Sequence, residues 1–244
     1  MTTNNVGGKM RKILSIIFSV FILFGTMSVS ASAIGMLNDI DGHWAEECIK
    51  RAIDKGIING YPDGSFKPDN NVSRAELAKI LTIAFDLNSA AKLPEEFEDV
   101  ENNQWYYSYV QKAAYYIPKY RLPVAYPSMQ PYLSTPGKFL PNNEAVRMHV
   151  AEALVEITID KKELQIELPS VEVMQMEVNE KFKDGYELFV AHDGLPAGNA
   201  ERMIKYTWLA NNMGIMQGEP DGYFYPYRHM TRAELVTAVD RMMK

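Results

Sequence analysis

Two arginines stand where a protein chain can build a binding site for a carboxylate. Arg74 and Arg232 each follow a Ser or Thr and precede Ala-Glu. This Ser/Thr-Arg-Ala-Glu pattern predicts a capping box, which places the arginine in the first turn of a helix. Backbone N–H groups at a helix start attract anions, and a guanidinium beside them can bind a carboxylate through two hydrogen bonds. The predicted chemistry is therefore recognition of an acidic ligand.

A structural interpretation of the same arginines is also open. Each could pair with an acidic residue of a neighbouring segment, for instance Asp39 or Asp99, and so hold two parts of the fold together. Residue types alone do not choose between these interpretations. Glu76 and Glu234 need no ligand, because the capping box explains both of them.

Each arginine closes one copy of an internal repeat. Residues 56–76 and 214–234 align without a gap and share a Pro-Asp-Gly turn that is followed by Ser/Thr-Arg-Ala-Glu. A weaker copy between them keeps fewer of these features: Phe97-Glu-Asp99-Val, Trp105, Phe139-Leu-Pro141 and Arg147. Such self-similarity predicts repeated units that bury their apolar faces against one another.

The first copy indicates how one unit is built. Apolar residues from Trp44 to Ile53 recur at spacings of three and four, which predicts a helix that ends at Gly56. Residues 61–64 predict a turn, and Ser73 starts the second helix. Both helices are too short to be stable alone, so we expect an all-α bundle of repeats.

These motifs resemble the S-layer homology family. The resemblance rests on Gly-Tyr-Pro-Asp-Gly-x-Phe-x-Pro before Ser73-Arg-Ala-Glu76, and on Asp39-Ile-Asp-Gly-His43-Trp44-Ala45 at the opening of the first copy. It covers nearly all the chain beyond residue 36, with three copies of which the second is degenerate. The resemblance implies an all-α fold of three helix–loop–helix repeats in a pseudo-threefold bundle, with irregular insertions in repeats two and three.

The function that the resemblance implies is that of a non-catalytic anchor. Proteins of this family bind a secondary cell-wall polysaccharide without a covalent link, and that polymer often carries ketal-linked pyruvate. A pyruvyl ketal presents a carboxylate, so the resemblance favours ligand binding by the arginines. The candidate glycan-binding residues are these arginines with turn glycines, aspartates and tryptophans of the repeats: Arg74, Arg147, Arg232, Gly64, Gly222, Asp39, Asp99, Trp44 and Trp105.

Repeats two and three depart from the pattern. In repeat two, extra residues replace the turn, and tyrosines are dense between residues 106 and 132. We expect these rings to pack, with a sugar-stacking platform as the alternative. Val146 stands where the capping Ser or Thr would be, so we expect Asn142 or Asn143 to cap that helix instead. In repeat three, residues 192–198 predict an irregular surface loop.

The repeats also set the expected domain boundaries. Basic residues, an apolar run and Ala31-Ser-Ala33 occur in the order of a signal peptide, and the apolar run is short for a membrane span of about 20 residues. Residues 164–178, which connect repeats two and three, alternate in part between apolar and polar side chains. This pattern is consistent with short strands or an extended link. The expected segments are a signal peptide at 1–33, repeat one at 34–92, repeat two at 93–158, the connector at 159–181 and repeat three at 182–244.

Composition limits the classes of partner. The chain has 25 Lys and Arg against 31 Asp and Glu, which argues against a general nucleic-acid or polyanion binder. An anionic polymer would have to be held in local pockets. The four histidines have no metal-ligand spacing, and no phosphate-loop or dinucleotide motif occurs.

We therefore expect no enzyme, no cofactor, no nucleic-acid partner, and no membrane contact after signal cleavage. The expected partner is a secondary cell-wall polysaccharide, with another surface protein as a further partner. The alternative function is a surface protein–protein adaptor built on decayed repeats, and a wall-modifying hydrolase ranks third.

Overall fold

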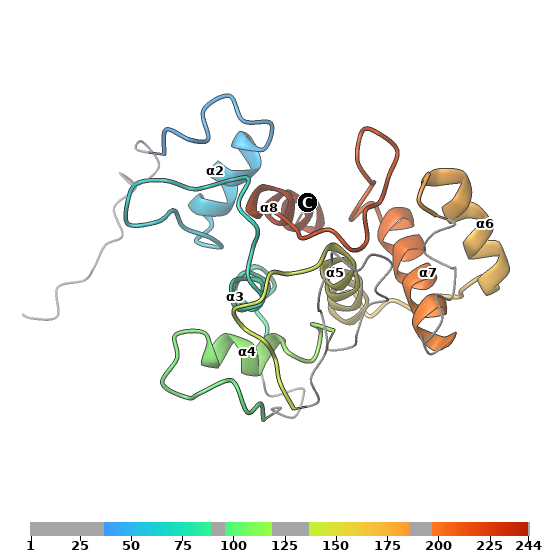
Figure 1. The fold of residues 1–244 in the computed structure, drawn as a ribbon, viewed down its shortest axis with the longest axis horizontal. Coiled ribbons are helices and arrows are strands. Elements are labelled where there is room, and N and C mark those ends of the chain that lie inside the picture. The colour runs from blue at the N-terminus through green and yellow to red at the C-terminus, as the bar shows by residue number, and fades with distance from the viewer. Residues whose placement is uncertain (1–36, 89–95, 119–136, 186–196, 244) are drawn as a thin grey trace, which may run out of the picture. The chain divides into compact units, whose positions relative to one another are not determined.

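The computed structural model describes residues 37–88, 96–118, 137–185 and 197–243, which all belong to one compact unit. These residues form helices joined by turns, with no strand among them, so the all-α prediction is confirmed (Figure 1). The helices are α2 (Glu46–Asp54), α3 (Arg74–Ala84), α4 (Tyr107–Ala113), α5 (Arg147–Lys161), α6 (Val171–Lys181), α7 (Ala197–Asn212) and α8 (Arg232–Met242). The predicted signal peptide and much of the tyrosine-rich insertion lie outside the described residues, as does most of the 192–198 loop.

Helices α3 and α8 begin as the sequence predicts. The Ser73 hydroxyl accepts a hydrogen bond from the Glu76 N–H, and the Glu76 carboxylate accepts one from the Ser73 N–H. Thr231 and Glu234 repeat this capping box at the start of α8. Gly56 follows α2 with a φ of 68°, a left-handed conformation that glycine adopts without strain.

Helix α5 begins differently. Its N-cap is Val146, with no side-chain hydrogen bond, so the prediction that Asn142 or Asn143 caps this helix is wrong. The N–H groups of Arg147 and Met148 instead donate to carbonyl oxygens of the repeat-three loop, at 2.8 and 2.9 Å. These bonds to another repeat hold the start of α5 without a side-chain cap, and local sequence cannot indicate them.

The same two backbone bonds join every pair of repeats. At the start of α3, Arg74 N–H donates to Asn143 O and Ala75 N–H to Pro141 O, so repeat one is joined to repeat two. Helix α5 binds the loop of repeat three, and α8 binds the loop of repeat one at residues 68 and 70. The three junctions therefore form a closed cycle. A threefold symmetry in space stays a prediction.

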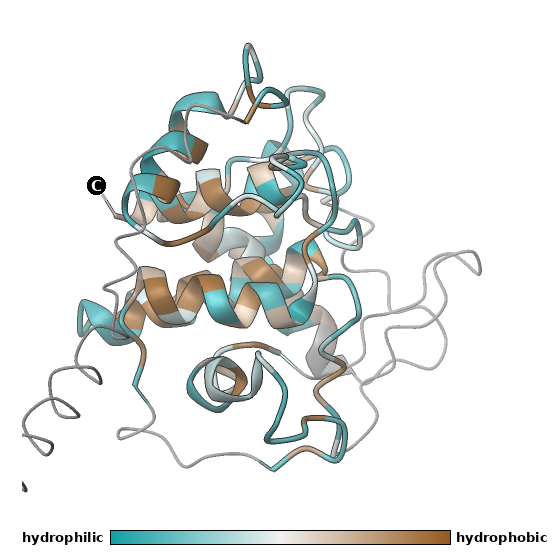
Figure 2. Ribbon diagram, turned by 90° about the vertical axis from the view of Figure 1, so that its left-hand side faces the viewer, coloured by the Kyte–Doolittle hydropathy of each residue, from teal (hydrophilic) through white to brown (hydrophobic). Residues whose placement is uncertain are grey.

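Helix packing follows the same cycle. Helix α4 packs on α3, α7 packs on α5, and α2 packs on α8, so each first helix lies against the second helix of another repeat (Figure 1). The apolar, brown-coloured positions of the helices in Figure 2 are largely the ones buried in this packing. Three phenylalanines at equivalent loop positions are fully buried: Phe66, Phe139 and Phe224.

The connector contains a helix, so the strand interpretation is wrong for its second half. Ser170 caps α6 by accepting a hydrogen bond from the Val173 N–H. Met174 and Val178 are buried four residues apart, on the face that packs against α7. The sequence did not predict α6, because its apolar residues are few and closely spaced, and such short runs do not distinguish a strand from a helix.

The described tyrosines of repeat two mostly pack. Tyr106 and Tyr116 are buried, and Tyr107 and Tyr109 are partly buried against the core. Tyr115 is exposed, with its ring edge-on to that of Tyr116. The remaining tyrosines of the insertion lie outside the described residues.

Candidate functional site

An aspartate holds the loop before each second helix. Both carboxylate oxygens of Asp39 accept hydrogen bonds from the N–H groups of Phe66 and Lys67, at 2.6 to 3.0 Å. Asp99 and Asp184 make the equivalent bonds in the other repeats: Asp99 to Phe139 and Leu140, and Asp184 to Phe224 and Tyr225. The aspartates therefore position the loops against which the helix starts dock.

These loops need a clamp because their backbone is strained. The residue between the phenylalanine and the proline has a positive φ in all three repeats: Lys67 at 56°, Leu140 at 59° and Tyr225 at 55°. A left-handed conformation costs a residue with a side chain about 1 kcal/mol or more. Charge-assisted hydrogen bonds to the two N–H groups offset that cost.

Arg232 lies beneath the loop of repeat one. Only 3% of its surface is exposed. Its Nε donates to Phe66 O at 2.9 Å and its Nη2 to Asn59 O at 2.9 Å, while its Nη1 donates to the Glu76 carboxylate at 3.1 Å. The guanidinium also lies 4.7 Å from the centre of the Tyr61 ring. Arg232 thus pairs with an acidic residue of another repeat, as the structural interpretation expects, although most of its partners are backbone carbonyls.

A groove opens above this arginine, which we call the Arg232 groove. It has a volume of about 220 Å³. Its lining comes from all three repeats: Ile57, Ile58, Asn59, Gly60, Tyr61, Glu76, Lys79, Ile80, Trp105 and Arg232. Trp105 of repeat two lies at the edge of the groove and is 55% exposed, so its indole ring is available to a ligand.

Lys79 supplies the accessible cation of the Arg232 groove. Its Nζ lies 5.9 Å from the Trp105 ring centre, and among the described residues it forms no ion pair. Lys79 is not among the residues predicted from the sequence. Its spacing was a usable signal, because Lys79 follows Glu76 by three positions and so shares its helix face.

A second groove occupies the equivalent place in repeat three, and we call it the Arg147 groove. It has a volume of about 410 Å³, and Trp44 of repeat one lies at its edge with 64% of its surface exposed. Its lining again comes from all three repeats: Trp44, Arg147, Met216, Gly218, Glu219, Pro220, Met230, Glu234, Thr237, Ala238 and Arg241. Arg147, which belongs to the degenerate second repeat, therefore lines a described groove.

Arg147 differs from Arg232 in its partners. Its Nη1 lies 2.9 Å from Glu219 and 3.7 Å from Glu234. Arg228 binds the same two carboxylates, at 2.9 and 2.5 Å. Burial lowers the pKa of Arg147, and the two carboxylates oppose that shift. In the repeat alignment, Glu219 replaces Tyr61 and Thr237 replaces Lys79.

Arg74 lines neither groove. It is buried, and its Nε and Nη2 donate to Phe139 O at 2.8 Å and to Pro118 O at 3.1 Å. Burial lowers its pKa to about 10. Residues 119–136, which follow Pro118, lie outside the described residues. Where repeat one has Trp44, repeat three has Arg202, which is paired with Glu152 of α5.

The two predicted turn glycines lie outside both grooves. Gly64 and Gly222 have φ values of 80° and 88° and close their turns through hydrogen bonds to the carbonyl oxygens of residues 61 and 219. The glycines that line the grooves are Gly60 and Gly218. A Cβ at either position would lie within 3 Å of a neighbouring side chain, so packing alone requires glycine there.

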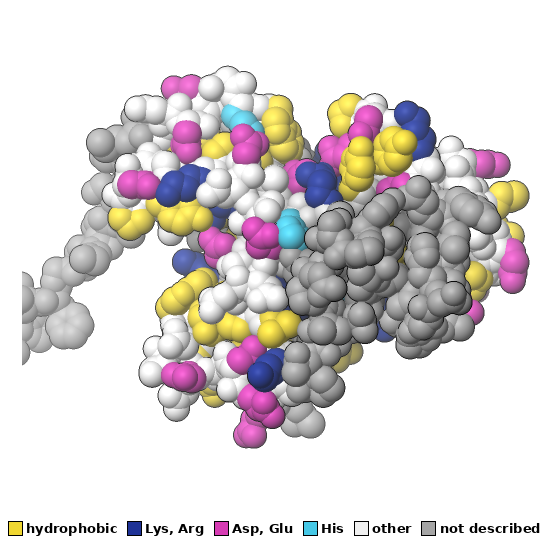
Figure 3. All heavy atoms as spheres, viewed as in Figure 1, with side chains coloured by type: hydrophobic (Ala, Val, Ile, Leu, Met, Phe, Trp, Pro, Cys, Tyr) yellow, Lys and Arg dark blue, Asp and Glu magenta, His cyan; other side chains and the backbone are white. Residues whose placement is uncertain are grey.

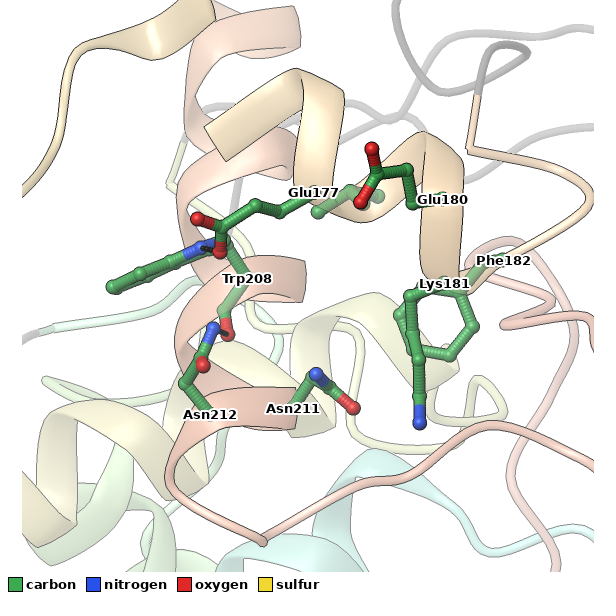
Figure 4. A pocket seen from close by; sticks show the side chains of 8 residues that line it. Glu177, Glu180, Lys181, Phe182, Trp208, Asn211 and Asn212 are labelled. Carbon is green, nitrogen blue, oxygen red and sulfur yellow. Dashed lines mark hydrogen bonds between the residues drawn. The ribbon is translucent and has the colours of Figure 1, made fainter. Parts of the chain in front are cut away.

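A third hollow lies between α6 and α7, away from the helix starts (Figure 4). It measures about 250 Å³, and Glu177 accepts a hydrogen bond from the Trp208 indole N–H at 2.6 Å within it. Glu180 and Lys181 also line it. Two carboxylates against one ammonium do not suit an anionic ligand.

The described residues on one face of the molecule carry no single field of charge. On the face shown in Figure 3, Lys and Arg side chains are scattered among Asp and Glu. Within the described residues, His, Cys, Asp and Glu form no group that could hold a metal ion. In the same part of the chain, no helix has the length and apolar character needed to cross a membrane.

Comparison with known proteins identifies the matched segments. The S-layer homology domain model matches residues 37–78 and 209–236. The chain is 35% identical to a cellulosome-anchoring protein of Acetivibrio thermocellus over 80 residues, which are 33% of this chain and 18% of that protein. It is 32% identical to an S-layer protein of Bacillus licheniformis over 106 residues, which are 42% of this chain and 12% of that protein.

An exoglucanase of Acetivibrio thermocellus is 22% identical over 228 residues, which cover 88% of this chain and 17% of the enzyme. The chain thus spans no more than 18% of the length of these three relatives. The two matched segments lie in the first and third predicted repeats, so the resemblance to the S-layer homology family is confirmed there. These matches support the predicted location, a secreted protein of the cell surface or cell wall.

Proposed function

We propose that this protein binds a secondary cell-wall polysaccharide in the grooves at its repeat junctions, and that an acidic unit of the polymer occupies the Arg232 groove. The observation that carries the proposal is the pairing of an exposed tryptophan with a buried arginine in each groove. Sugar rings pack their C–H faces on such indoles, while a few polar groups fix their orientation.

The Arg232 groove suits a carboxylate, such as that of a pyruvyl ketal. Lys79 lies on its wall without an ion pair among the described residues, and an ammonium attracts a carboxylate as a point charge. Arg232 uses three of its five N–H groups on protein acceptors, which leaves two for a ligand. The proposal therefore assigns the first contact with the acid to Lys79 and a supporting contact to Arg232.

The other predicted residues fall into separate roles under this proposal. Trp44 and Trp105 stack on sugar rings, and Arg147 lies in the second groove. Asp39 and Asp99 act indirectly by fixing the loops, and Gly64 and Gly222 shape the turns. Arg74 belongs to the junction between repeats one and two, and its role in binding stays a prediction.

The test is sedimentation of the mature chain, residues 34–244, with purified cell walls before and after removal of their secondary polysaccharide. We expect the protein to sediment only with the untreated walls. The Lys79→Thr/Trp105→Ala variant should bind less, because it removes the cation and the ring without touching the buried arginine. Lys162→Thr, an exposed position at the end of α5, is the matched control.

Equal sedimentation with both kinds of wall would overturn the polysaccharide as the ligand. Sedimentation that needs the polysaccharide but is unchanged in Lys79→Thr/Trp105→Ala would overturn the Arg232 groove as the site. Binding that resists removal of the polysaccharide would instead indicate a wall protein, as the adaptor alternative requires.

A further inference from the structure

We infer that the Arg147 groove binds an uncharged sugar ring, whereas the Arg232 groove binds an acidic one. The inference rests on the proposed function, since it takes both grooves as sites for units of a wall polymer. It concerns what each groove accepts, and it follows from the residues that differ between them.

The Arg147 guanidinium, the buried cation of this groove, is already paired with carboxylates. Glu219 and Glu234 each lie between Arg147 and Arg228, at distances from 2.5 to 3.7 Å. Arg241 is exposed at the end of the lining and donates to Ile215 O at 3.4 Å. A carboxylate ligand would therefore meet two carboxylates in this groove, against the single Glu76 of the Arg232 groove.

Two buried polar atoms in this groove have no partner among the described residues. They are Arg147 Nε and Thr237 Oγ1, on side chains that are 5% and 9% exposed. In the other groove, the equivalent Arg232 Nε donates to Phe66 O. A buried donor without a partner costs about 1–3 kcal/mol, so these atoms favour a ligand that brings hydroxyl groups.

The remaining lining suits a sugar without a charge. Trp44 offers an exposed ring, and Met216, Met230 and Ala238 add apolar surface beside it. The two glutamates can accept hydrogen bonds from ligand hydroxyls, since a carboxylate has several lone pairs. An exposed aromatic ring, apolar neighbours and acceptors for hydroxyl protons suit a neutral pyranose, and the one exposed cation, Arg241, lies at the end of the lining.

Two substitutions between the repeats account for the difference. Glu219 stands in place of Tyr61 and turns Arg147 away from the loop carbonyl towards its own carboxylate. Thr237 stands in place of Lys79 and removes the free ammonium. The specificity-determining residues are therefore Glu219 and Thr237.

Each groove has its own fluorescent reporter, because the chain has three tryptophans and two of them line the two grooves. Trp44 alone reports on the Arg147 groove when Trp105 and Trp208 are changed to Phe. Trp105 alone reports on the Arg232 groove when Trp44 and Trp208 are changed. Each mature protein is titrated with N-acetylglucosamine and with N-acetylmuramic acid, which differ by a carboxylate-bearing lactyl group.

We expect the Trp44 reporter to bind N-acetylglucosamine roughly tenfold more tightly than N-acetylmuramic acid, because like charges oppose the acid in a partly buried site. The Trp105 reporter should show the opposite preference. In the Trp44 reporter, Glu219→Tyr/Thr237→Lys should reverse the preference. If that double variant does not fold, Glu219→Gln keeps the shape and should still raise the affinity for the acid.

Equal binding of the two sugars to the Trp44 reporter, tighter binding of the acid, or no binding of either would overturn the inference. These outcomes leave the proposed function intact when the wild-type protein still needs the polysaccharide to sediment with walls. Loss of that requirement would overturn the proposed function itself, so the two failures are distinguishable.

Discussion

The Arg232 and Arg147 junctions share a backbone and differ in their side chains. In both, the first two N–H groups of a helix donate to carbonyl oxygens of another repeat's loop. Arg232 then donates its Nε to the loop as well, whereas Arg147 pairs with two glutamates. The comparison indicates that the shared backbone hydrogen bonds hold the repeats together at both junctions. Side chains on that frame can change, and ligand chemistry can change with them.

The largest expected effect lies in what the junctions have in common. Asp184 is buried and accepts hydrogen bonds from the N–H groups of Phe224 and Tyr225. Asp184→Ala leaves both donors unpaired beside a strained residue, so the free energy of unfolding should fall by about 3 kcal/mol. Urea denaturation of the variant and the wild type measures this loss of stability. The exposed control Asp54→Ala should change stability by less than about 0.5 kcal/mol.

A smaller effect should separate the two arginines. Arg232→Ala leaves Phe66 O and Asn59 O without their partner, and we expect a loss of about 2 kcal/mol in the free energy of unfolding. Arg147→Ala leaves Glu219 and Glu234 still paired with Arg228, so its loss should be about 1 kcal/mol. Equal losses in denaturation would show that the side-chain partners do not distinguish the junctions.

The helix caps offer a third comparison. Thr231→Ala removes the hydroxyl that caps α8, which should cost about 1 kcal/mol of stability. The start of α5 has no such cap and relies on the backbone bonds to repeat three. Thermal unfolding of Thr231→Ala tests this estimate, and a loss several times larger would indicate that the backbone bonds fail without the cap.

The smallest expected effect comes from replacing Lys79, which should weaken ligand binding and leave the stability of the fold unchanged. Lys79→Thr gives the Arg232 groove the residue that Thr237 supplies in the other groove. Because Lys79 is partly exposed, its loss should weaken wall binding about threefold at low salt, and less at high salt. Stability should stay within about 0.5 kcal/mol of the wild type. Unchanged affinity at low salt would remove Lys79 from the site.

Local signals made part of this structure predictable. The capping boxes at Ser73 and Thr231, the helix end at Gly56 and the turns at residues 61–64 and 219–222 each depend on residues close in sequence. The sequence therefore predicted the two well-preserved repeats and the all-α fold. It could not predict how α5 starts, because the backbone partners of Arg147 and Met148 belong to a distant loop.

The sites were predictable only in outline. The sequence identified the arginines and the tryptophans, yet the partners of Arg232 lie up to 173 residues away and decide what the guanidinium can still bind. It could not show that Asp39 and Asp99 clamp loops, nor that Asp184 does the same. The role of Glu219 appears only beside Arg147 and Arg228, since a single substitution in a turn gives no sign of its ion pairs.

The most direct test of groove binding is a nuclear magnetic resonance titration with purified wall polysaccharide. It monitors the indole N–H resonances of the three tryptophans. The account predicts that the resonances of Trp44 and Trp105 shift with added polymer, because these rings line the two grooves. Trp208 belongs to α7 and binds Glu177 of α6, away from both grooves, so its resonance should not shift and serves as an internal control. A shift of Trp208 alone, or of none of the three, would contradict the account.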